Sequence, residues 1–306
     1  MQKLKSAKLK NKVIDITTSY LFVLPVILGI LLFTLVPMIT SLYYSFTDFN
    51  PTIMNSKPNF VGFQNYIDAF GKNFEATGNS LLVTFSYTLI TVPLNIVLSF
   101  AVALLLNQNM KGMRLFRTIY YIPVIIPAVA AGLLWNDITK ETGGMFNVIL
   151  VEYLKLPAYS FYNSADTVLP SLIFMSLFGM GGGMVLWLAQ LKGIPESIYE
   201  AASLDGANAF VRLFRITIPM CTPMIFYNLI MNIIGGLQIF TQVLLLRTAE
   251  NAEGLNFFVL HIYDNAMGSD KMGYASALSW ILFIMIALIT AITFKTSKWV
   301  YYGEEV

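Results

Sequence analysis

The sequence predicts an all-α integral membrane protein with six transmembrane helices. Of its 306 residues, 57% are hydrophobic and only 12% are charged, whereas soluble domains carry about 25% charged residues. Several windows of roughly twenty residues contain no Asp, Glu, Lys or Arg, and this length crosses ~30 Å of hydrocarbon. A charge at the centre of such a helix costs roughly 2.5–3.5 kcal/mol on insertion scales. The charge-free windows therefore predict membrane spans.

Six apolar segments are long enough to cross a bilayer. They are residues 18–46, 79–107, 116–136, 168–191, 219–246 and 274–295. Prolines inside the first three segments predict kinked helices, because a packed neighbour must satisfy each carbonyl group that a proline leaves without a donor. The first segment lacks a small-residue cleavage site, so we interpret it as a retained helix rather than a signal peptide.

The basic residues are sorted by side of the membrane. Thirteen Lys and Arg residues fall on the side of the N-terminus and six on the other, so the positive-inside rule places both termini in the cytoplasm. The predicted domains are a basic tail (1–17), a first helix with an outer loop (18–78), a five-helix core (79–298) and a C-terminal tail (299–306).

Composition and motifs argue against several classes of function. A single Cys221 and a single His261 predict neither an internal disulfide nor a metal site. The chain has no GxxxxGK[ST] loop for ATP and no HExxH or GxSxG motif, so an intramembrane enzyme has little support. No charged residue lies centrally in any span, which disfavours an ion-driven secondary transporter. Since the net charge of +2 is sorted by side, it predicts no nucleic-acid partner.

Residues 193–219 form the one substantial loop on the predicted inner side. Pro195 fits the first position of a helix, and Gly206 fits its end in a left-handed conformation. The adjacent Ala201 and Ala202 give this helix a low face that another protein surface could approach closely. From periodicity alone, an ordinary solvated loop explains the pattern equally well.

This loop resembles the EAA motif of binding-protein-dependent importer permeases. The match consists of Glu200-Ala201-Ala202, three residues, Gly206, nine residues, and Ile216-x-Ile218-Pro219; the family commonly has Leu where Ile218 stands. Further segments resemble the carbohydrate branch of this family, the maltose-type permeases. They are Arg114–Arg117, Tyr120–Pro123, Ser45–Phe49 and Phe60–Tyr66. Matching segments extend from the first span to the sixth.

The resemblance implies the type I ABC importer permease fold and a contact between this loop and a separate ATPase. Glu200 would face a basic residue of the ATPase, Gly206 would allow a sharp turn, and Ala201, Ala202 and Asp205 would belong to the same contact. The implied partners are a second homologous permease, two cytoplasmic ATPase subunits, an extracytoplasmic solute-binding protein, a sugar and membrane lipid. The chain itself would hold no cofactor, because the ATPase binds ATP and Mg. The implied location is the inner membrane of a bacterial or archaeal cell.

The fourth and fifth spans carry the candidate residues of a solute path. Glycines in the fourth span predict either close helix packing or room for a solute at a break in the helix. Amides in the fifth span predict bonds either to neighbouring helices or to sugar hydroxyls. The resemblance implies solute contacts around Asn232, Gly236 and Ile239. The full candidate set is Gly179, Gly182, Asn228, Asn232, Gly236, Gln238 and Ile239.

The same importer class carrying a polyamine, an amino acid or phosphate is the alternative to a sugar importer. Charged solutes predict charges of opposite sign within the membrane, so the absence of a central charge from every span favours a neutral, hydroxyl-rich solute. Residues 247–254 depart from the Thr-x-Gly-Gly-Pro-like turn common in the family, which leaves the docking of a solute-binding protein open. His261 follows in the same loop, where we expect an exposed surface residue.

Overall fold

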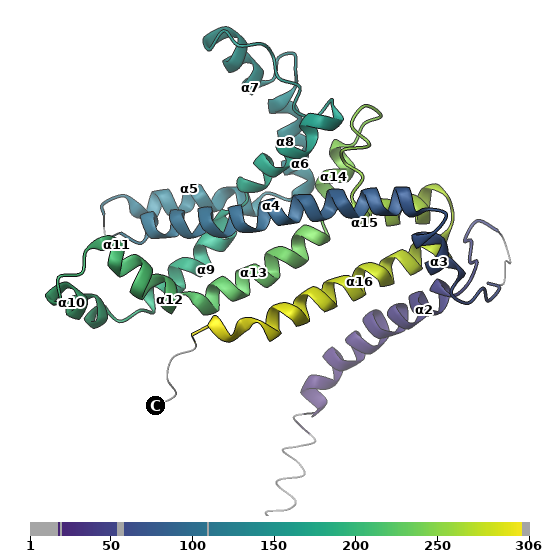
Figure 1. Ribbon diagram of the computed structural model, residues 1–306, viewed down its shortest axis with the longest axis horizontal. Coiled ribbons are helices and arrows are strands. Elements are labelled where there is room, and N and C mark those ends of the chain that lie inside the picture. Colours follow the sequence, from purple (N-terminus) through teal and green to yellow (C-terminus); the bar gives the residue numbers. More distant parts are fainter. Residues whose placement is uncertain (1–17, 19, 54–57, 109, 302–306) are drawn as a thin grey trace, which may run out of the picture. The chain divides into compact units, whose positions relative to one another are not determined.

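The computed structural model describes residues 18, 20–53, 58–108 and 110–301 (Figure 1). The predicted N-terminal tail, residues 1–17, lies outside this part of the chain. The described residues form two compact units. One unit is drawn from Met1–Ala69 and Asn265–Trp280, and the other from Phe70–Asp264 and Ile281–Val306. The second unit, called the core unit below, holds most of the predicted helices.

Five helices of the described residues are long and apolar enough to cross a membrane. They are Tyr20–Ser45, Phe74–Leu106, Ala165–Lys192, Thr222–Leu246 and Met272–Lys295. A sixth crossing is present if Met113–Ile125 and Ala128–Thr139 count as one, although these two helices are bent by 100° at their break. The predicted third span is therefore two helices that meet at a corner, not one kinked helix.

The corner between α5 (Met113–Ile125) and α6 (Ala128–Thr139) follows from one proline. Ile126 has φ −70° and ψ 124°, the extended conformation favoured before proline because the ring clashes with a helical predecessor. Pro127 is extended as well, with φ −55° and ψ 140°, so two consecutive residues leave the helical region. The chain therefore changes direction sharply.

Two further spans are interrupted. A turn at residues 178–180 separates α8 (Ala165–Leu177) from α9 (Gly181–Lys192), within the glycine-rich stretch whose helix propensity is low. Residues 238–240 likewise separate α13 (Thr222–Leu237) from α14 (Thr241–Leu246). The fourth and fifth predicted spans therefore each consist of two helical pieces.

Helix α4 (Phe74–Leu106) runs unbroken past all these pieces and contains Pro93. It packs against α8, α9, α13 and α15 (Figure 1). The remaining elements are η1 Leu31–Leu35, α2 Val36–Ser45, α3 Gln64–Phe70, α7 Met145–Val148, η2 Ile149–Tyr153, α10 Glu196–Leu204, α11 Ala209–Arg212, η3 Leu213–Thr217, α12 Ile218–Met220, α15 Phe258–Tyr263, η4 Asp264–Gly268, α16 Met272–Lys295 and η5 Ser297–Trp299.

The core unit contains two separate hydrophobic clusters. The first, called the α8 cluster, is built around Tyr87, Trp135, Leu172, Val243 and Leu260. The second, called the α9 cluster, is built around Leu106, Met113, Trp187, Ile194 and Cys221. Helix α4 contributes buried residues to both clusters, so it is the common support of the unit.

Buried asparagines fix the connections that flank the α8 cluster. Asn147 donates to the carbonyl oxygens of Lys140 and Tyr159, 3.0 Å away in each case. Asn251 donates in the same way to Tyr162 and Leu246. These bonds satisfy carbonyl groups of loop residues and of the last residue of α14, so the loops are held in place without helices of their own.

An ion pair between Arg247 and Asp264 joins the end of α14 to the end of α15 in the same region. His261, near both charges, is half-buried, so the expectation of an exposed surface residue is wrong. Burial lowers the pKa of His261 below its ordinary value of 6.5.

In the other unit, the segments 45–49 and 60–66 are joined by hydrogen bonds and ring contacts. The Asp48 carboxylate accepts bonds from the backbone and side-chain N–H groups of Asn59, at 2.7 and 3.0 Å. Asn65 donates to the carbonyl oxygens of Ser45 and Thr47. Phe46 packs edge-on against Phe63, with ring centroids 5.2 Å apart. These bonds give the two family-like segments a structural role.

Gly181 permits a backbone contact that a larger residue would abolish. A Cβ atom there would lie 1.9 Å from the Tyr120 carbonyl oxygen of α5, whereas at Gly179 the nearest atom would be 3.6 Å away. We expect Gly181→Ala to destabilise the protein by about 1–3 kcal/mol, the usual cost of overpacking, and Gly179→Ala to have little effect. The thermal unfolding midpoint of the purified transporter measures both. Equal midpoints for the two variants would contradict this contact.

Asp48 predicts a dependence of stability on pH. Its bonds from Asn59 hold the pKa of Asp48 below the ordinary value of 3.8. A carboxylate with a lowered folded pKa stabilises the fold above the unfolded pKa, and this contribution is lost as pH falls through the folded value. The thermal midpoint should therefore fall less for Asp48→Asn than for wild type on acidification below that ordinary value. Asp68→Asn on α3 controls for the loss of one charge; identical profiles of wild type and Asp48→Asn would refute the assignment.

Candidate functional site

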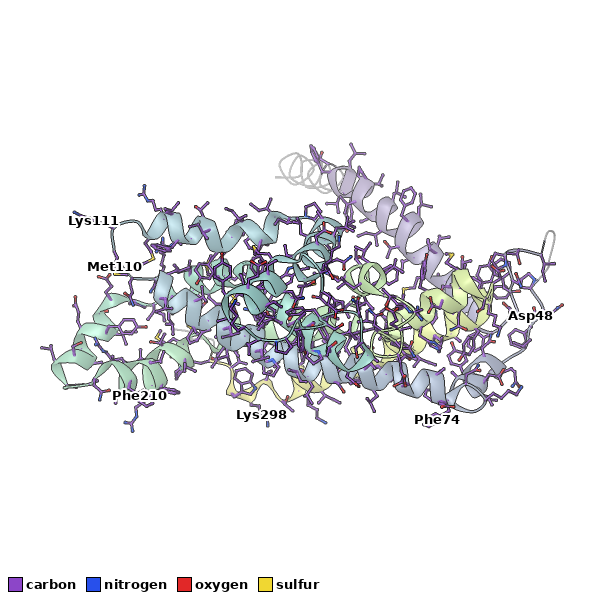
Figure 2. The ribbon with its side chains drawn as sticks, turned by 90° about the horizontal axis from the view of Figure 1, so that it is seen from above. Asp48, Phe74, Met110, Lys111, Phe210 and Lys298 are labelled. Carbon is purple, nitrogen blue, oxygen red and sulfur yellow. The ribbon has the colours of Figure 1, made fainter. Side chains whose placement is uncertain are left out.

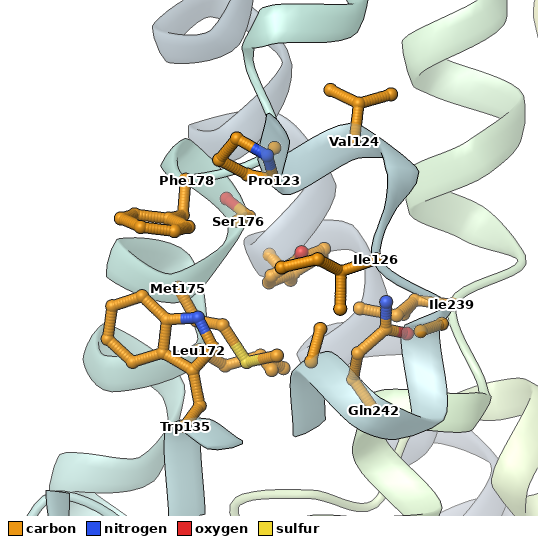
Figure 3. A pocket seen from close by; sticks show the side chains of 14 residues that line it. Pro123, Val124, Ile126, Trp135, Leu172, Met175, Ser176, Phe178, Ile239 and Gln242 are labelled. Atoms are coloured by element: carbon orange, nitrogen blue, oxygen red, sulfur yellow. The ribbon is translucent and has the colours of Figure 1, made fainter. Parts of the chain in front are cut away.

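Two adjoining cavities lie in the core unit where the interrupted helices meet. Figure 3 shows the first of them. The first, called the aromatic cavity, encloses about 460 Å³ and the second, called the amide cavity, about 400 Å³. Both are lined by Tyr87, Ile239 and Gln242, so the two cavities share a wall. Their sizes fall in the range of small-molecule sites, about 300–1,000 Å³.

Trp135 lines the aromatic cavity and packs against three other aromatic rings. It meets Phe174 and Phe178 edge to face, with ring centroids 5.7 and 5.4 Å apart, and stacks on Phe146 at 5.8 Å. Such pairs fix the orientation of a ring beyond what burial alone provides. Figure 3 shows Phe178 beside Pro123, and Pro123 and Ile126 line the same cavity, so the corner between α5 and α6 borders this space.

Six of the twelve residues that line the amide cavity have amide or aliphatic hydroxyl side chains. They are Thr91, Asn95, Asn232, Gln238, Thr241 and Gln242. Asn95 donates one bond to the Thr91 carbonyl oxygen at 3.0 Å, and Asn232 donates one to the Asn228 carbonyl oxygen at 2.8 Å. An amide has two N–H donors and an oxygen acceptor, so each retains capacity for a solute. None of the described residues that line the two cavities is charged.

The structure gathers five of the seven candidate solute-path residues around these cavities. Gly179 lines the aromatic cavity, Asn232, Gly236 and Gln238 line the amide cavity, and Ile239 lines both. Gly236 also lies close to α4, because a Cβ there would be 2.9 Å from the Thr88 side chain. Its position therefore combines helix packing with a place in the wall.

Gly182 and Asn228 line neither cavity. A Cβ at Gly182 would contact Val124 of α5 at 3.6 Å. Asn228 is buried, and its side-chain oxygen would lie 3.5 Å from a Cβ at Gly183. Both positions lie in helix packing in this structure, which is the first of the two interpretations that the sequence allowed.

Residues 193–219 form a compact protrusion that is anchored in the α9 cluster. Ile194 is buried there, and Tyr199 of α10 packs against it and shares a 2.9 Å hydrogen bond with Thr217. The helix begins at Glu196, directly after Pro195. Gly206 has φ +78°, the left-handed conformation that the sequence predicted.

The tip of this protrusion exposes apolar side chains. Leu204 is 90% exposed and Phe210 is 70% exposed. Glu200, Ala201, Asp205 and Gly206 are exposed, while Ala202 is half-buried. Figure 2 shows Phe210 at the same end of the core unit as Met110, with Phe74 toward the other end.

Residues 95–300 match the family described as the binding-protein-dependent transport system inner membrane component. The chain belongs to this family. It is therefore a multi-pass permease of the cell membrane and not an enzyme. The match covers α5 to α16 and includes the whole of residues 193–219.

Individual relatives match nearly the whole length of this chain. The chain is 37% identical to the probable ABC transporter permease protein YesP of Bacillus subtilis, over 95% of this chain and 94% of that protein. It is 29% identical to the trehalose/maltose transport system permease protein MalF of Thermococcus litoralis, over 96% and 97% of the two chains. A chain of the bacterial alginate ABC transporter, solved with an alginate pentasaccharide-bound periplasmic protein, has a TM-score of 0.82 and 21% identity over 94% of this chain and 96% of that one. That likeness shows the fold.

Sequence reasoning missed the part of the permease site that α4 contributes. Tyr87, Thr91 and Asn95 line the amide cavity, yet none was a candidate. A signal was present, because the polar residues of this span recur every three or four positions, as on one face of a helix. They are Ser80, Thr84, Thr88, Thr91, Asn95 and Ser99. Trp135 of the aromatic cavity had no such signal.

Asn232 and Asn228 should respond differently to replacement. Asn232→Leu removes hydrogen-bonding capacity worth about 1–1.5 kcal/mol from the cavity wall, so we expect the solute concentration for half-maximal uptake to rise about tenfold. Asn228→Leu, one turn away on α13, is the matched control. It should lower the thermal midpoint while leaving that concentration unchanged. The reverse pattern in uptake by reconstituted vesicles would show that Asn228 faces the solute.

Proposed function

We propose that this permease forms one half of the channel of an ATP-driven importer of a sugar or oligosaccharide. The observation that carries the proposal is the pair of adjoining cavities with uncharged amide, hydroxyl and aromatic walls. Sugars present many hydroxyl groups, which amides can bond, and apolar ring faces, which aromatic rings can contact. The relative named as a trehalose/maltose permease supports the same solute class.

A second homologous permease would complete the channel. Besides the two cavities, an apolar groove of about 350 Å³ opens beside Trp135. It is lined by residues of α5 and α8, among them Tyr120 and Phe174, which are 41% and 51% exposed. A face of this kind is suited to burial against another membrane helix. The extracytoplasmic solute-binding protein would deliver the sugar from the opposite side to the ATPase.

We assign residues 193–219 to the contact with the cytoplasmic ATPase, with both termini on the same side of the membrane. The exposed Leu204 and Phe210 supply an apolar surface for a protein partner. Glu200 and Asp205 add negative charge beside it, and Ala201 and Ala202 keep the helix surface low. The left-handed Gly206 supports a sharp turn at this point.

In this importer ATP and Mg bind to two ATPase subunits, and the permease holds no cofactor. ATP binding would bring the ATPase subunits together and draw the two protrusions with them. Because Ile194 and Tyr199 tie the protrusion to the α9 cluster, force applied at the tip reaches the helices around the cavities.

Uptake by the complete transporter tests the solute class. The two permeases, the ATPase and the solute-binding protein are reconstituted in vesicles, and ATP-driven uptake of labelled neutral saccharides is measured. Unlabelled saccharides should compete, whereas a polyamine, an amino acid and phosphate should not. Competition by one of those three in place of saccharides would overturn the sugar assignment but retain the importer.

Glu200→Ala tests the coupling. We expect ATP-driven uptake to fall at least about tenfold, equivalent to roughly 1.4 kcal/mol of lost coupling, because the charge that pairs with the ATPase is gone. Glu196→Ala, in the first turn of the same helix, is the matched control and should retain uptake. The test compares uptake with ATP hydrolysis in the same vesicles. Normal uptake by Glu200→Ala would remove the proposed role of this residue.

A further inference from the structure

We propose that the short helix α3 lies in the lipid headgroup region of the bilayer and buries an apolar surface there. This surface, called the α3 surface below, consists of Phe60, Phe63, Ile67 and Phe70. Its partner is membrane lipid of the leaflet at which the first span ends. The inference goes beyond the proposed function and rests on it in one respect, because the proposed function makes this leaflet the extracytoplasmic one.

Helix α3 exposes large apolar side chains along one side. The Phe63 carbonyl accepts the first helical bond, from the Ile67 N–H at 3.0 Å, and Phe70 ends the helix. These three residues are spaced as i, i+4 and i+7, which is the spacing of one helix face. Phe63 is 67% exposed, Ile67 is 61% exposed, and Phe60 beside them is 73% exposed. A group of exposed apolar residues of this kind marks an interaction surface.

The other side of α3 is bonded to the end of the first span. Asn65 donates to the carbonyl oxygens of Ser45 and Thr47, at 2.9 and 2.8 Å. The Tyr66 hydroxyl donates to the Ser45 hydroxyl at 2.8 Å. Ser45 is the last residue of the apolar helix Tyr20–Ser45, so α3 lies at the level where the first span ends (Figure 1).

The length of the first span places this level in the headgroup region. Its helix has 26 residues, which corresponds to roughly 39 Å at 1.5 Å per residue, whereas the hydrocarbon core is ~30 Å thick. The ends of the helix therefore reach beyond the hydrocarbon. Tyr43 and Tyr44 stand at this end, and tyrosine is enriched where a membrane helix meets the headgroups.

The α3 surface continues the surface that the first span presents to the membrane. The described residues bury none of the apolar window of this span. Ile39 and Tyr43 are exposed on one side of its helix, and Phe46 follows three residues later on the same side. The ring of Phe46 lies 6.4 Å from that of Phe60 and 5.2 Å from that of Phe63, between ring centroids. A continuous apolar surface therefore extends from the first span onto α3.

Lipid fits this position better than a protein partner does. A helix with Phe and aliphatic residues on one side and polar residues on the other is typical of helices that lie in the membrane interface. The α3 surface has four residues, whereas a stable protein interface uses about 20–30 residues on each side. Because Asn65 and Tyr66 bond α3 to Ser45, insertion of the α3 surface would fix the depth of the first span.

Nitroxide spin labels measure the depth of α3 in the complete transporter, reconstituted in vesicles. Labels are attached to Phe63→Cys, Ile67→Cys or Gln64→Cys in a Cys221→Ala background. Gln64 is exposed outside the α3 surface, so it is the matched control on the same helix. Collisions of each label with oxygen, which concentrates in lipid, are compared with collisions with a nickel chelate, which stays in water. The ratio of oxygen to nickel collisions should be severalfold higher for Ile67→Cys and Phe63→Cys than for Gln64→Cys.

Two results would overturn the proposal. Frequent nickel collisions at Ile67→Cys would show that the α3 surface faces water. Rare collisions with both reagents would show that a protein, such as the second permease, covers it. If loss of the contact with Phe46 prevents Phe63→Cys from folding, Ile67→Cys still gives the answer. Absence of ATP-driven uptake by the wild-type transporter would instead refute the proposed function and would leave the depth of α3 unaffected.

Discussion

The need to satisfy backbone hydrogen bonds inside a membrane governs the architecture of this permease. Hydrocarbon offers no partner for a free N–H or C=O group, so irregular backbone is tolerated only where it is covered by protein or lines a cavity. The breaks at residues 126–127, 178–180 and 238–240 obey this constraint together, because residues of each line the same pair of cavities. The positions of the helix breaks and the positions of the two cavities therefore follow from one rule.

The polar side chains of α4 show a second effect of the same constraint. Thr84, Thr88 and Thr91 each donate their hydroxyl to the carbonyl group four residues earlier, at 2.7 to 2.8 Å. These bonds make a polar residue tolerable in an apolar helix, since the hydroxyl donor is already satisfied. Their oxygens keep acceptor capacity, and Thr84 uses it for the Phe258 N–H. The polar side chains on this face of α4 can therefore both pack against neighbouring helices and line a cavity.

Hydropathy located the spans from the sequence because a charge in lipid is costly. A span is therefore recognisable from the residues of that segment alone. Pattern and resemblance together also located the protrusion at 193–219 and five cavity residues. The corner at Ile126 was misjudged as a kink, because the sequence shows the prolines but not whether a neighbour restores the helix. Gly179 and Gly182 lie in the same glycine-rich stretch, and the sequence does not distinguish their roles. In the structure, Gly179 lines the aromatic cavity and Gly182 packs near Val124. That difference depends on how α5 packs, which no local pattern encodes.

The same packing connects the protrusion to the aromatic cavity. Tyr199 joins the protrusion to Thr217 and to the α9 cluster, and Gly181 brings α9 into backbone contact with α5 at Tyr120. Tightly packed groups transmit displacement because they leave little void to absorb it. This packed path leads from the protrusion through α9 to α5, and the breaks beside Phe178 and Ile126 lie at its end. Because Phe178 and Ile126 line the aromatic cavity, the packed path joins the protrusion to the cavity wall.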